Sequence, residues 1–311
     1  MRLILIAVFS FIQIAVSMAQ IQIVNKEVNG LIFKCRVAGN PTGEPVILLH
    51  GWPETSHMWI GLMEKLSAEG YYCIAPDQRG FSPQARPTKV KDYAIEFLAG
   101  DVIGIADAFG IKNFQLVGHD WGSAIGWAVV AFYPKRIKSW TAMSVPHLKA
   151  FSDAVRFDKK QKKMSQYMSF FQWRGIPEWF LLKKDRLNLR KTWKKSSPEE
   201  LQDYLDVIGN KPALKASLGY YRANYKLLKK GQDMENYLEV NTPTMMIWGK
   251  KDIAIGPVGV EGTAQYMKGP YEYVELDAGH WLMQEAFEGC ASPILAHLNR
   301  NKYVFIGGNN R

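Results

Sequence analysis

The stretch Gly118-His119-Asp120-Trp121-Gly122 decides the fold, because it joins an apolar run to a helical run. Phe114–Val117, just before it, has the composition of a buried strand, and Gly122–Phe132 has helical spacing. A Gly-x-Asp-x-Gly turn between a strand and a helix is tight, and small residues on both sides of the central residue suit such a turn. The pattern therefore predicts that Asp120 occupies the position of a nucleophile elbow.

Strand and helix patterns alternate on both sides of this turn. The predicted strands are Ile21–Val28 and Leu31–Ala38, joined by Asn29-Gly30 as a hairpin, then Val46–Leu49, Tyr72–Ala75, Ser139–Ser144, Thr244–Trp248 and Tyr271–Leu276. The predicted helices are His57–Ala68, Asp92–Phe109, and segments around Gly262–Met267 and Pro293–Asn299. Such alternation predicts the α/β class, with a mostly parallel sheet covered by helices on both faces.

Helical spacing alone continues between Pro146 and Val240, where almost no strand pattern is found. A helical block inserted late in an alternating series is typical of a lid over the sheet. We therefore expect a core of residues 20–145 and 241–311, interrupted by a helical cap of residues 146–240. Residues 1–19 form a third unit with a different composition.

Residues 1–19 have the composition of a signal peptide. A basic start leads into the apolar run Leu3–Val16, and Ser17-Met18-Ala19 predicts cleavage after Ala19. The protein is then exported, to the periplasm or out of the cell, and no stable membrane insertion is expected after cleavage. The alternative is an uncleaved N-terminal membrane anchor, although the run is short and is interrupted by Ser10 and Gln13.

The formal net charge of +10 is concentrated in the middle third of the chain. Residues 149–239 contain 20 Lys or Arg and 11 Asp or Glu, a net charge of +9. Such a field attracts anionic surfaces or acidic ligands. The alternative is a set of solvated helix faces. No motif indicates a nucleic-acid partner.

Three cysteines, Cys35, Cys73 and Cys290, are too few and too scattered for a disulfide framework or a metal site. One bridge at most can form. Export permits pairing of Cys35 with Cys73, which the sequence leaves open.

Polar motifs follow other predicted strands as well. They are His50-Gly51-Trp52-Pro53, Gly249-Lys250-Lys251-Asp252 and Asp277-Ala278-Gly279-His280. Taken singly, Asp252 suits a capping residue and His280 a hydrogen-bonded structural histidine. Together with Asp120 they follow the order nucleophile, acid, histidine, and the carboxyl ends of parallel strands are where chemistry collects.

With these motifs in place, the chain resembles the α/β-hydrolase family over essentially its whole mature length. Within that family it resembles the epoxide hydrolases, with haloalkane dehalogenases next. The resemblance implies an α/β-hydrolase fold with a mostly parallel eight-stranded sheet and an inserted helical lid. It implies that Asp120 forms an alkyl ester, that His280 oriented by Asp252 activates water, and that the N–H groups of Trp52 and Trp121 form the oxyanion hole.

An aspartate nucleophile does not identify the leaving group. A departing alkoxide requires hydroxyl donors, as in epoxide hydrolases, where two lid tyrosines supply them. Tyr167, four residues before Phe171-Gln172, and Tyr221, directly before Arg222, match those positions. The alternative is that these rings only pack, because the segment contains other tyrosines.

The resemblance therefore implies an epoxide hydrolase that converts a small-molecule epoxide to a vicinal diol and needs no cofactor or metal, and the signal peptide predicts its export. The basic middle third of the chain favours substrates with an acidic group, such as fatty-acid epoxides. One alternative is a haloalkane dehalogenase with the same triad. An alternative from another class is a secreted binding or virulence protein that acts without catalysis, which the basic helical segment suggests.

Overall fold

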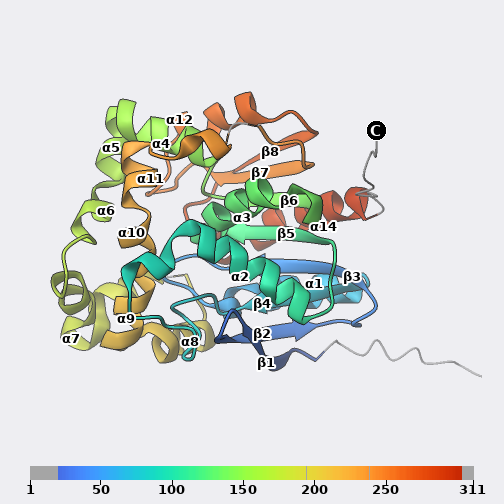
Figure 1. The fold of residues 1–311 in the computed structure, drawn as a ribbon, viewed down its shortest axis with the longest axis horizontal. Coiled ribbons are helices and arrows are strands. Elements are labelled where there is room, and N and C mark those ends of the chain that lie inside the picture. The colour runs from blue at the N-terminus through green and yellow to red at the C-terminus, as the bar shows by residue number, and fades with distance from the viewer. Residues whose placement is uncertain (1–19, 194, 238, 303–311) are drawn as a thin grey trace, which may run out of the picture.

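The computed structural model describes residues 20–193, 195–237 and 239–302. The predicted signal peptide lies outside the described residues. Within them, one eight-stranded sheet has the strand order β1-β2-β4-β3-β5-β6-β7-β8 (Figure 1). The strands are β1 (Gln22–Val28), β2 (Leu31–Ala38), β3 (Glu44–Leu49), β4 (Tyr71–Pro76), β5 (Phe114–His119), β6 (Ile137–Met143), β7 (Thr244–Gly249) and β8 (Tyr271–Leu276). Only the β1–β2 and β2–β4 pairs are antiparallel, so the predicted mostly parallel sheet is confirmed.

The predicted N-terminal hairpin is present. Val28 pairs with Leu31 across a two-residue loop. Both loop residues have positive φ, 54° at Asn29 and 74° at Gly30. Asn-Gly is a preferred sequence for such a tight loop, because both residues tolerate this conformation.

Helices cover both faces of the sheet (Figure 1). On one face lie α2 (Ile95–Ala108) and α3 (Trp121–Phe132), and on the other lie α1 (Ile60–Ala68) and α14 (Phe287–Asn301). The shorter elements outside the segment between β6 and β7 are η1 (Ser56–Trp59), η2 (Val90–Tyr93), η3 (Pro134–Arg136), α12 (Pro257–Glu261), η5 (Gly262–Tyr266) and α13 (Leu282–Glu285). The strands in the middle of the sheet are apolar on both sides because both faces are covered.

Two predicted helix boundaries were wrong. The helix expected over Asp92–Phe109 is divided, because Ala94 is extended between η2 and α2. The side chain of Asn224 holds this break: it accepts a hydrogen bond from the Ile95 N–H (2.8 Å) and donates one to the Tyr93 carbonyl (2.9 Å). Near the carboxyl end of the described chain, the helix expected around Pro293–Asn299 begins earlier, so Pro293 lies inside α14 rather than at its start.

The segment between β6 and β7 is helical in its described residues. It contains α4 (Leu148–Phe157), α5 (Lys159–Met164), α6 (Gln166–Phe170), α7 (Ile176–Thr192), α8 (Pro198–Ile208), α9 (Lys211–Ser217), α10 (Gly219–Ala223), α11 (Tyr225–Lys230) and η4 (Met234–Tyr237). In Figure 1 these helices gather along one side of the sheet. Helix α7 is interrupted at residues 183–186, whose backbone is not helical. None of the described helices is long and apolar enough to cross a membrane.

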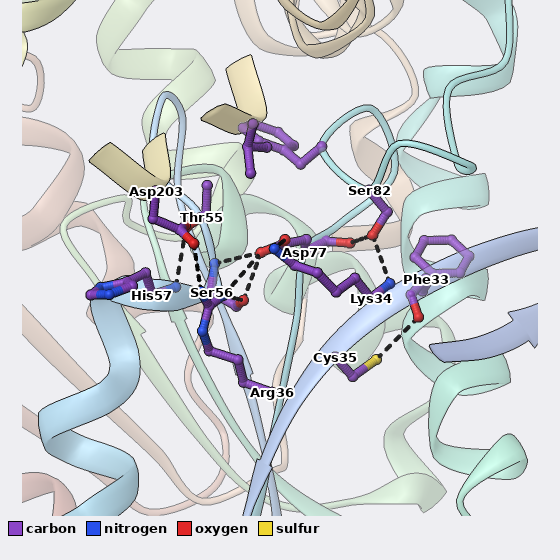
Figure 2. A network of polar contacts seen from close by, with 12 residues as sticks. Phe33, Lys34, Cys35, Arg36, Thr55, Ser56, His57, Asp77, Ser82 and Asp203 are labelled. Atoms are coloured by element: carbon purple, nitrogen blue, oxygen red, sulfur yellow. Dashed lines mark hydrogen bonds and ion pairs between the residues drawn. The ribbon is translucent and has the colours of Figure 1, made fainter. Parts of the chain in front are cut away.

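A buried polar network attaches this helical segment to the sheet (Figure 2). Asp77, at the end of β4, pairs with Lys34 (2.7 Å) and accepts hydrogen bonds from the hydroxyl and N–H of Ser56 (2.6 and 2.9 Å). Arg36 donates to Ser56 (2.5 Å) and, through its other terminal nitrogen, to Asp203 of α8 (2.6 Å). Burial alone would raise the pKa of Asp77, but the neighbouring cations, Lys34 first, hold it below its ordinary value.

Candidate active site

Asp120 occupies the sharp turn between β5 and α3. Its backbone has φ 50° and ψ −115°, a conformation that non-glycine residues rarely adopt. The turn requires glycine at Gly122, where an added Cβ would lie 2.0 Å from the Leu49 carbonyl oxygen. The carboxylate is therefore held at the amino terminus of a twelve-residue helix, where a negative charge is favoured.

The structure brings together the three predicted triad residues from the ends of β5, β7 and β8. His280 Nδ1 lies 2.8 Å from Asp252 Oδ2, and His280 Nε2 lies 3.5 Å from Asp120 Oδ2. All three side chains are buried. The imidazole thus bridges two carboxylates that are far apart in the sequence.

The charges of this cluster reinforce one another. Burial by itself lowers the pKa of His280, but Asp252 and Asp120 outweigh burial and place the pKa well above its ordinary value. Burial by itself raises the pKa of Asp252, but His280 and donated hydrogen bonds leave it below its ordinary value. Both nitrogens of His280 face carboxylate oxygens, so these surroundings favour the doubly protonated, cationic imidazole.

Ser144 is a fourth member of this cluster that the sequence analysis missed. Its hydroxyl donates to Asp252 Oδ2 (2.7 Å) and lies 3.0 Å from His280 Nδ1. The other Asp252 oxygen accepts from the N–H groups of Ala254 (2.7 Å) and Ile255 (2.9 Å). The signal was present, since Ser144 is the polar residue at the carboxyl end of a predicted strand, as the other motif residues are.

His119 and Glu54 form a second pair behind the triad, and the sequence analysis missed both. His119 Nε2 lies 2.8 Å from the backbone carbonyl of His280, and Nδ1 lies 3.0 Å from Glu54 Oε2. A carbonyl only accepts, so Nε2 must carry a proton, and a second proton must lie between Nδ1 and Glu54. Gln284 donates to the other Glu54 oxygen (2.9 Å). This chain of contacts holds the backbone carbonyl of His280 in place.

One of the two predicted oxyanion-hole donors contacts Asp120 directly. The Trp52 N–H donates to Asp120 Oδ1 at 2.7 Å. The Trp121 N–H belongs to the first residue of α3, and the first N–H groups of a helix have no intrahelical acceptor. The Trp52–Pro53 peptide bond is cis.

A small, partly open cavity, with about 310 Å³ of empty space when open solvent is included, lies in front of Asp120 and receives both predicted tyrosines. Its lining is Asp120, Trp121, Ala124, Val145, Phe151, Tyr167, Met168, Tyr221, Leu228 and Ile255. The rings of Tyr167 and Tyr221 are 5.8 Å apart, and Tyr221 also packs on Trp121 (5.1 Å). Burial raises the pKa of both hydroxyls and the charge on Asp120 raises it further, so both stay protonated and able to donate.

The cysteines singled out in the sequence behave as structural groups. Cys35, Cys73 and Cys290 are free and buried, so the pairing of Cys35 with Cys73 is absent. Across residues 20–302, apart from 194 and 238, no three His, Cys, Asp or Glu side chains are grouped as a metal site would require.

Residues 44–287 match the family described as the alpha/beta hydrolase fold. The chain therefore belongs to the α/β-hydrolase family, as the strand-end motifs predicted. The AB hydrolase superfamily protein YfhM of Bacillus subtilis (strain 168) is 30% identical over 263 residues, which is 83% of this chain and 91% of that protein. Epoxide hydrolase 3 of Xenopus tropicalis is 30% identical over 270 residues, which is 83% of this chain and 72% of that protein.

Solved structures show the same similarity. A mutant of an epoxide hydrolase from Bacillus megaterium, crystallised with its diol product, superposes with a TM-score of 0.81 at 26% identity, covering 89% of this chain and 100% of that one. A structure described among novel epoxide hydrolases in metagenomes from hot environments has a TM-score of 0.78 at 28% identity, covering 90% and 99%.

Proposed function

We propose that this protein is an epoxide hydrolase that opens its substrate through an ester on Asp120. The observation that carries the proposal is the cavity in which a buried carboxylate and two protonated tyrosines, Tyr167 and Tyr221, line the same apolar space. A carboxylate attacks saturated carbon without a base, and hydroxyl donors are what a departing alkoxide requires. The names of the relatives, epoxide hydrolases among them, support the same reaction.

In the first step, an oxygen of Asp120 attacks one carbon of the epoxide and the bond from that carbon to the ring oxygen breaks. The electron pair moves to the ring oxygen, which becomes an alkoxide. Tyr167 and Tyr221 donate hydrogen bonds to it. The product of this step is an alkyl ester of Asp120.

Ester formation prepares the second step by removing the charge on Asp120. That charge is one of the causes that keep the pKa of His280 high, so the pKa falls when the ester forms. The proton that His280 releases neutralises the alkoxide, and the neutral imidazole becomes a base for water.

Water then attacks the carbonyl carbon of Asp120, and His280 takes its proton. The N–H groups of Trp52 and Trp121 hold the developing oxyanion, and Asp252 balances the charge on the imidazolium. Collapse of the intermediate breaks the ester bond, and the departing alkoxide takes the proton of the new Asp120 carboxyl. A vicinal diol is released, Asp120 is again a carboxylate and His280 is again protonated.

We further propose that residues 146–240 act as a cap over this site. They supply Tyr167 and Tyr221, whereas the residues on either side supply the triad. Export with cleavage after Ala19 is the corresponding proposal for the N-terminal residues. An N-terminal sequence starting at Gln20 in protein recovered outside the cytoplasm supports it, and an intact N-terminus there contradicts it.

The decisive experiment is intact-mass analysis of His280→Gln after exposure to a panel of epoxides and haloalkanes. The alkyl ester should accumulate, because the base for its hydrolysis is missing. An epoxide adds its whole mass, whereas a haloalkane adds its mass without the halogen, which identifies a dehalogenase.

The matched control is His280→Gln combined with Asp120→Ala, which should gain no mass. If wild-type protein forms no diol and the single variant forms no adduct with any epoxide, the proposal fails. A biological effect that persists in Asp120→Ala indicates the non-catalytic alternative instead.

A further inference from the structure

An exposed group of large apolar side chains lies at the start of α7. We call it the aromatic patch: Trp173 (61% exposed), Ile176 (45%), Trp179 (63%) and Phe180 (38%). Ile176, Trp179 and Phe180 are three and four residues apart on a helix, so they share one face. Single exposed apolar residues are ordinary, but a contiguous group with two tryptophans marks an interaction surface.

Cations accompany the aromatic patch. Lys183 Nζ lies 4.4 Å from the centre of the Trp179 ring and 4.7 Å from that of Phe180. Beside the patch lies a groove of about 1540 Å³, solvent included. Arg174 lines this groove and directly follows Trp173 of the patch in the chain. We call it the basic groove, and its charged lining is Arg86, Lys89, Arg174, Glu178, Lys211, Lys215 and Arg222.

The positive charge of the basic groove is largely uncompensated. Its single carboxylate, Glu178, pairs with Arg222 at 2.9 Å. Among the described residues, no carboxylate lies within 4.0 Å of the side-chain nitrogens of Lys89, Arg174, Lys211 or Lys215, although ion pairs of this kind are common elsewhere on the surface. The groove therefore presents several free cations to solvent, next to exposed indole rings.

We propose that the aromatic patch and the basic groove together adsorb to a membrane surface that contains anionic lipids. Tryptophan rings favour the boundary between headgroups and acyl chains, and clustered Lys and Arg side chains attract anionic headgroups. The two features adjoin in the chain, where Trp173 of the aromatic patch precedes Arg174 of the basic groove. The contact is peripheral: rings enter the boundary layer and the rest of the chain stays in water.

The aromatic patch is joined to the candidate active site by a series of ring contacts. The ring of Phe180 lies 5.7 Å from that of Phe170, which lies 5.8 Å from that of Phe171. Phe171 in turn lies 4.9 Å from Tyr221. Adsorption therefore places the lipid close to the cavity, and an apolar epoxide dissolved in the membrane is delivered to that side. This consequence for substrates rests on the proposed function, whereas the adsorption does not.

The first test places a probe at the aromatic patch. Because all three native cysteines are buried, Ile176→Cys in the full chain can be labelled selectively with a polarity-sensitive fluorophore. The control is Val258→Cys on α12, a position of similar exposure (47%) outside the patch. Vesicles are phosphatidylcholine alone or phosphatidylcholine with one third phosphatidylglycerol.

The label at position 176 should shift its emission to the blue with the phosphatidylglycerol vesicles, and return when salt of about 1 M screens the charges. The label at position 258 should not respond. Residues 1–19 are common to both chains, so the position of the label decides, not the total amount adsorbed. A label at 176 that stays water-like, with or without adsorption of the chain, overturns the proposal.

The second test compares two double variants that reverse the same number of positive charges at different places on the molecule. Lys211→Glu with Lys215→Glu in the basic groove should weaken adsorption to the phosphatidylglycerol vesicles about tenfold or more. Lys160→Glu with Lys163→Glu on α5 changes the net charge equally and should weaken it much less. If both pairs of substitutions weaken adsorption equally, the attraction is non-specific and the proposed location of the contact is wrong. Circular dichroism and turnover of a soluble substrate, both unchanged, verify that each variant is folded.

Discussion

At the scale of one residue, the contacts of Asp120 distinguish its carboxylate from that of an ordinary surface aspartate. Its carboxylate accepts a hydrogen bond from the Trp52 N–H and lies 3.5 Å from His280. Around an aspartate on the protein surface, water would take the place of both the Trp52 N–H and His280. The tyrosines opposite, Tyr221 buried and Tyr167 half-buried, line the same apolar cavity as this carboxylate.

Tyr221→Phe and Tyr167→Phe should each slow formation of the ester on Asp120 markedly. Each change removes one hydroxyl that stabilises the alkoxide, and loss of such a donor costs about 10²-fold in rate or more. Rapid-mixing kinetics with a chromogenic epoxide measure this step.

The matched control for the tyrosines is Tyr225→Phe, which removes the hydroxyl that contacts Ser169 at 3.1 Å. Tyr225 does not line the cavity. An equal loss of rate in this control would show that the effect comes from general changes in the helical segment.

Asp120→Asn should lower the pKa of His280, because it removes the same charge that ester formation removes. NMR titration of labelled histidines, assigned with His280→Gln, measures the shift. A pKa of His280 that is unchanged in Asp120→Asn would contradict the proposed origin of the base.

The stability of the wild type should depend on pH in the corresponding way. The pKa of His280 is raised on folding, so its stabilising contribution is complete below the unfolded value of about 6.5 and disappears as pH rises through the folded value. The pKa of Asp252 is lowered, so its contribution is complete above the unfolded value and disappears as pH falls through the folded one. Urea denaturation of the wild type and Asp120→Asn across this range measures the difference.

At the scale of elements, the turn from β5 to α3 depends on close approach to β3. Gly122→Ala should cost at least about 2–3 kcal/mol in the free energy of unfolding, because its Cβ would meet the Leu49 carbonyl oxygen at 2.0 Å. The same change at Gly100, inside α2, meets nothing closer than 4.0 Å and should stabilise by about 0.5–1 kcal/mol. Denaturant unfolding of both variants is the measurement, and similar values for the two would contradict the steric argument.

The contact of α8 with the sheet depends on Asp203. It accepts from Arg36 at 2.6 Å and from the hydroxyl of Thr55. Asp203→Asn should lower the free energy of unfolding by about 2–3 kcal/mol, because two hydrogen bonds to a charged group are weakened beside a buried guanidinium.

The control for Asp203 lies one turn further along α8. Asp206 contacts only Gln202 among the described side chains, and both are exposed. Asp206→Asn should change stability by less than about 0.5 kcal/mol. If the two variants unfold alike, the contact between Arg36 and Asp203 does not hold α8 in place.

At the scale of the whole molecule, the cations and the reacting cavity occupy different places. The cavity lining contains no lysine or arginine, whereas the basic groove lies outside it. The field of the molecule should therefore act on an acid-bearing substrate during its approach rather than during the reaction.

We expect kcat/KM for a carboxylated epoxide to fall as salt increases, because the screening length shrinks from about 30 Å at 0.01 M to about 3 Å at 1 M. For styrene oxide, which is neutral, kcat/KM should stay constant. The ratio of the two values across a salt series is the measurement. A salt-independent ratio would remove the case for fatty-acid epoxides.

The sequence predicted those features that are written in local patterns. Strand and helix patterns alternate and polar turns follow the strands, so the mostly parallel sheet and the turn at Asp120 were predicted from local patterns. The number of strands and the roles of Asp252 and His280 came from the resemblance to the α/β-hydrolase family. Contacts between distant segments decided the rest. The start of α2 depends on Asn224, which belongs to a distant part of the sequence. The contact between His119 and Glu54 forms only when β3 and β5 lie side by side.

The place of the helical segment has a consequence for how this protein can vary. Trp140 and Thr244 are register partners on β6 and β7, so the chain leaves the sheet and returns to the neighbouring position. The entropy of closing such a loop grows only with the logarithm of its length, about 0.6 kcal/mol for each doubling. We therefore expect the sheet to accept segments of different length between these strands, provided that each keeps a carboxylate partner for Arg36. We expect that replacing this helical segment, by recombination or in the laboratory, changes which substrates are accepted while Asp120, Asp252 and His280 keep their positions.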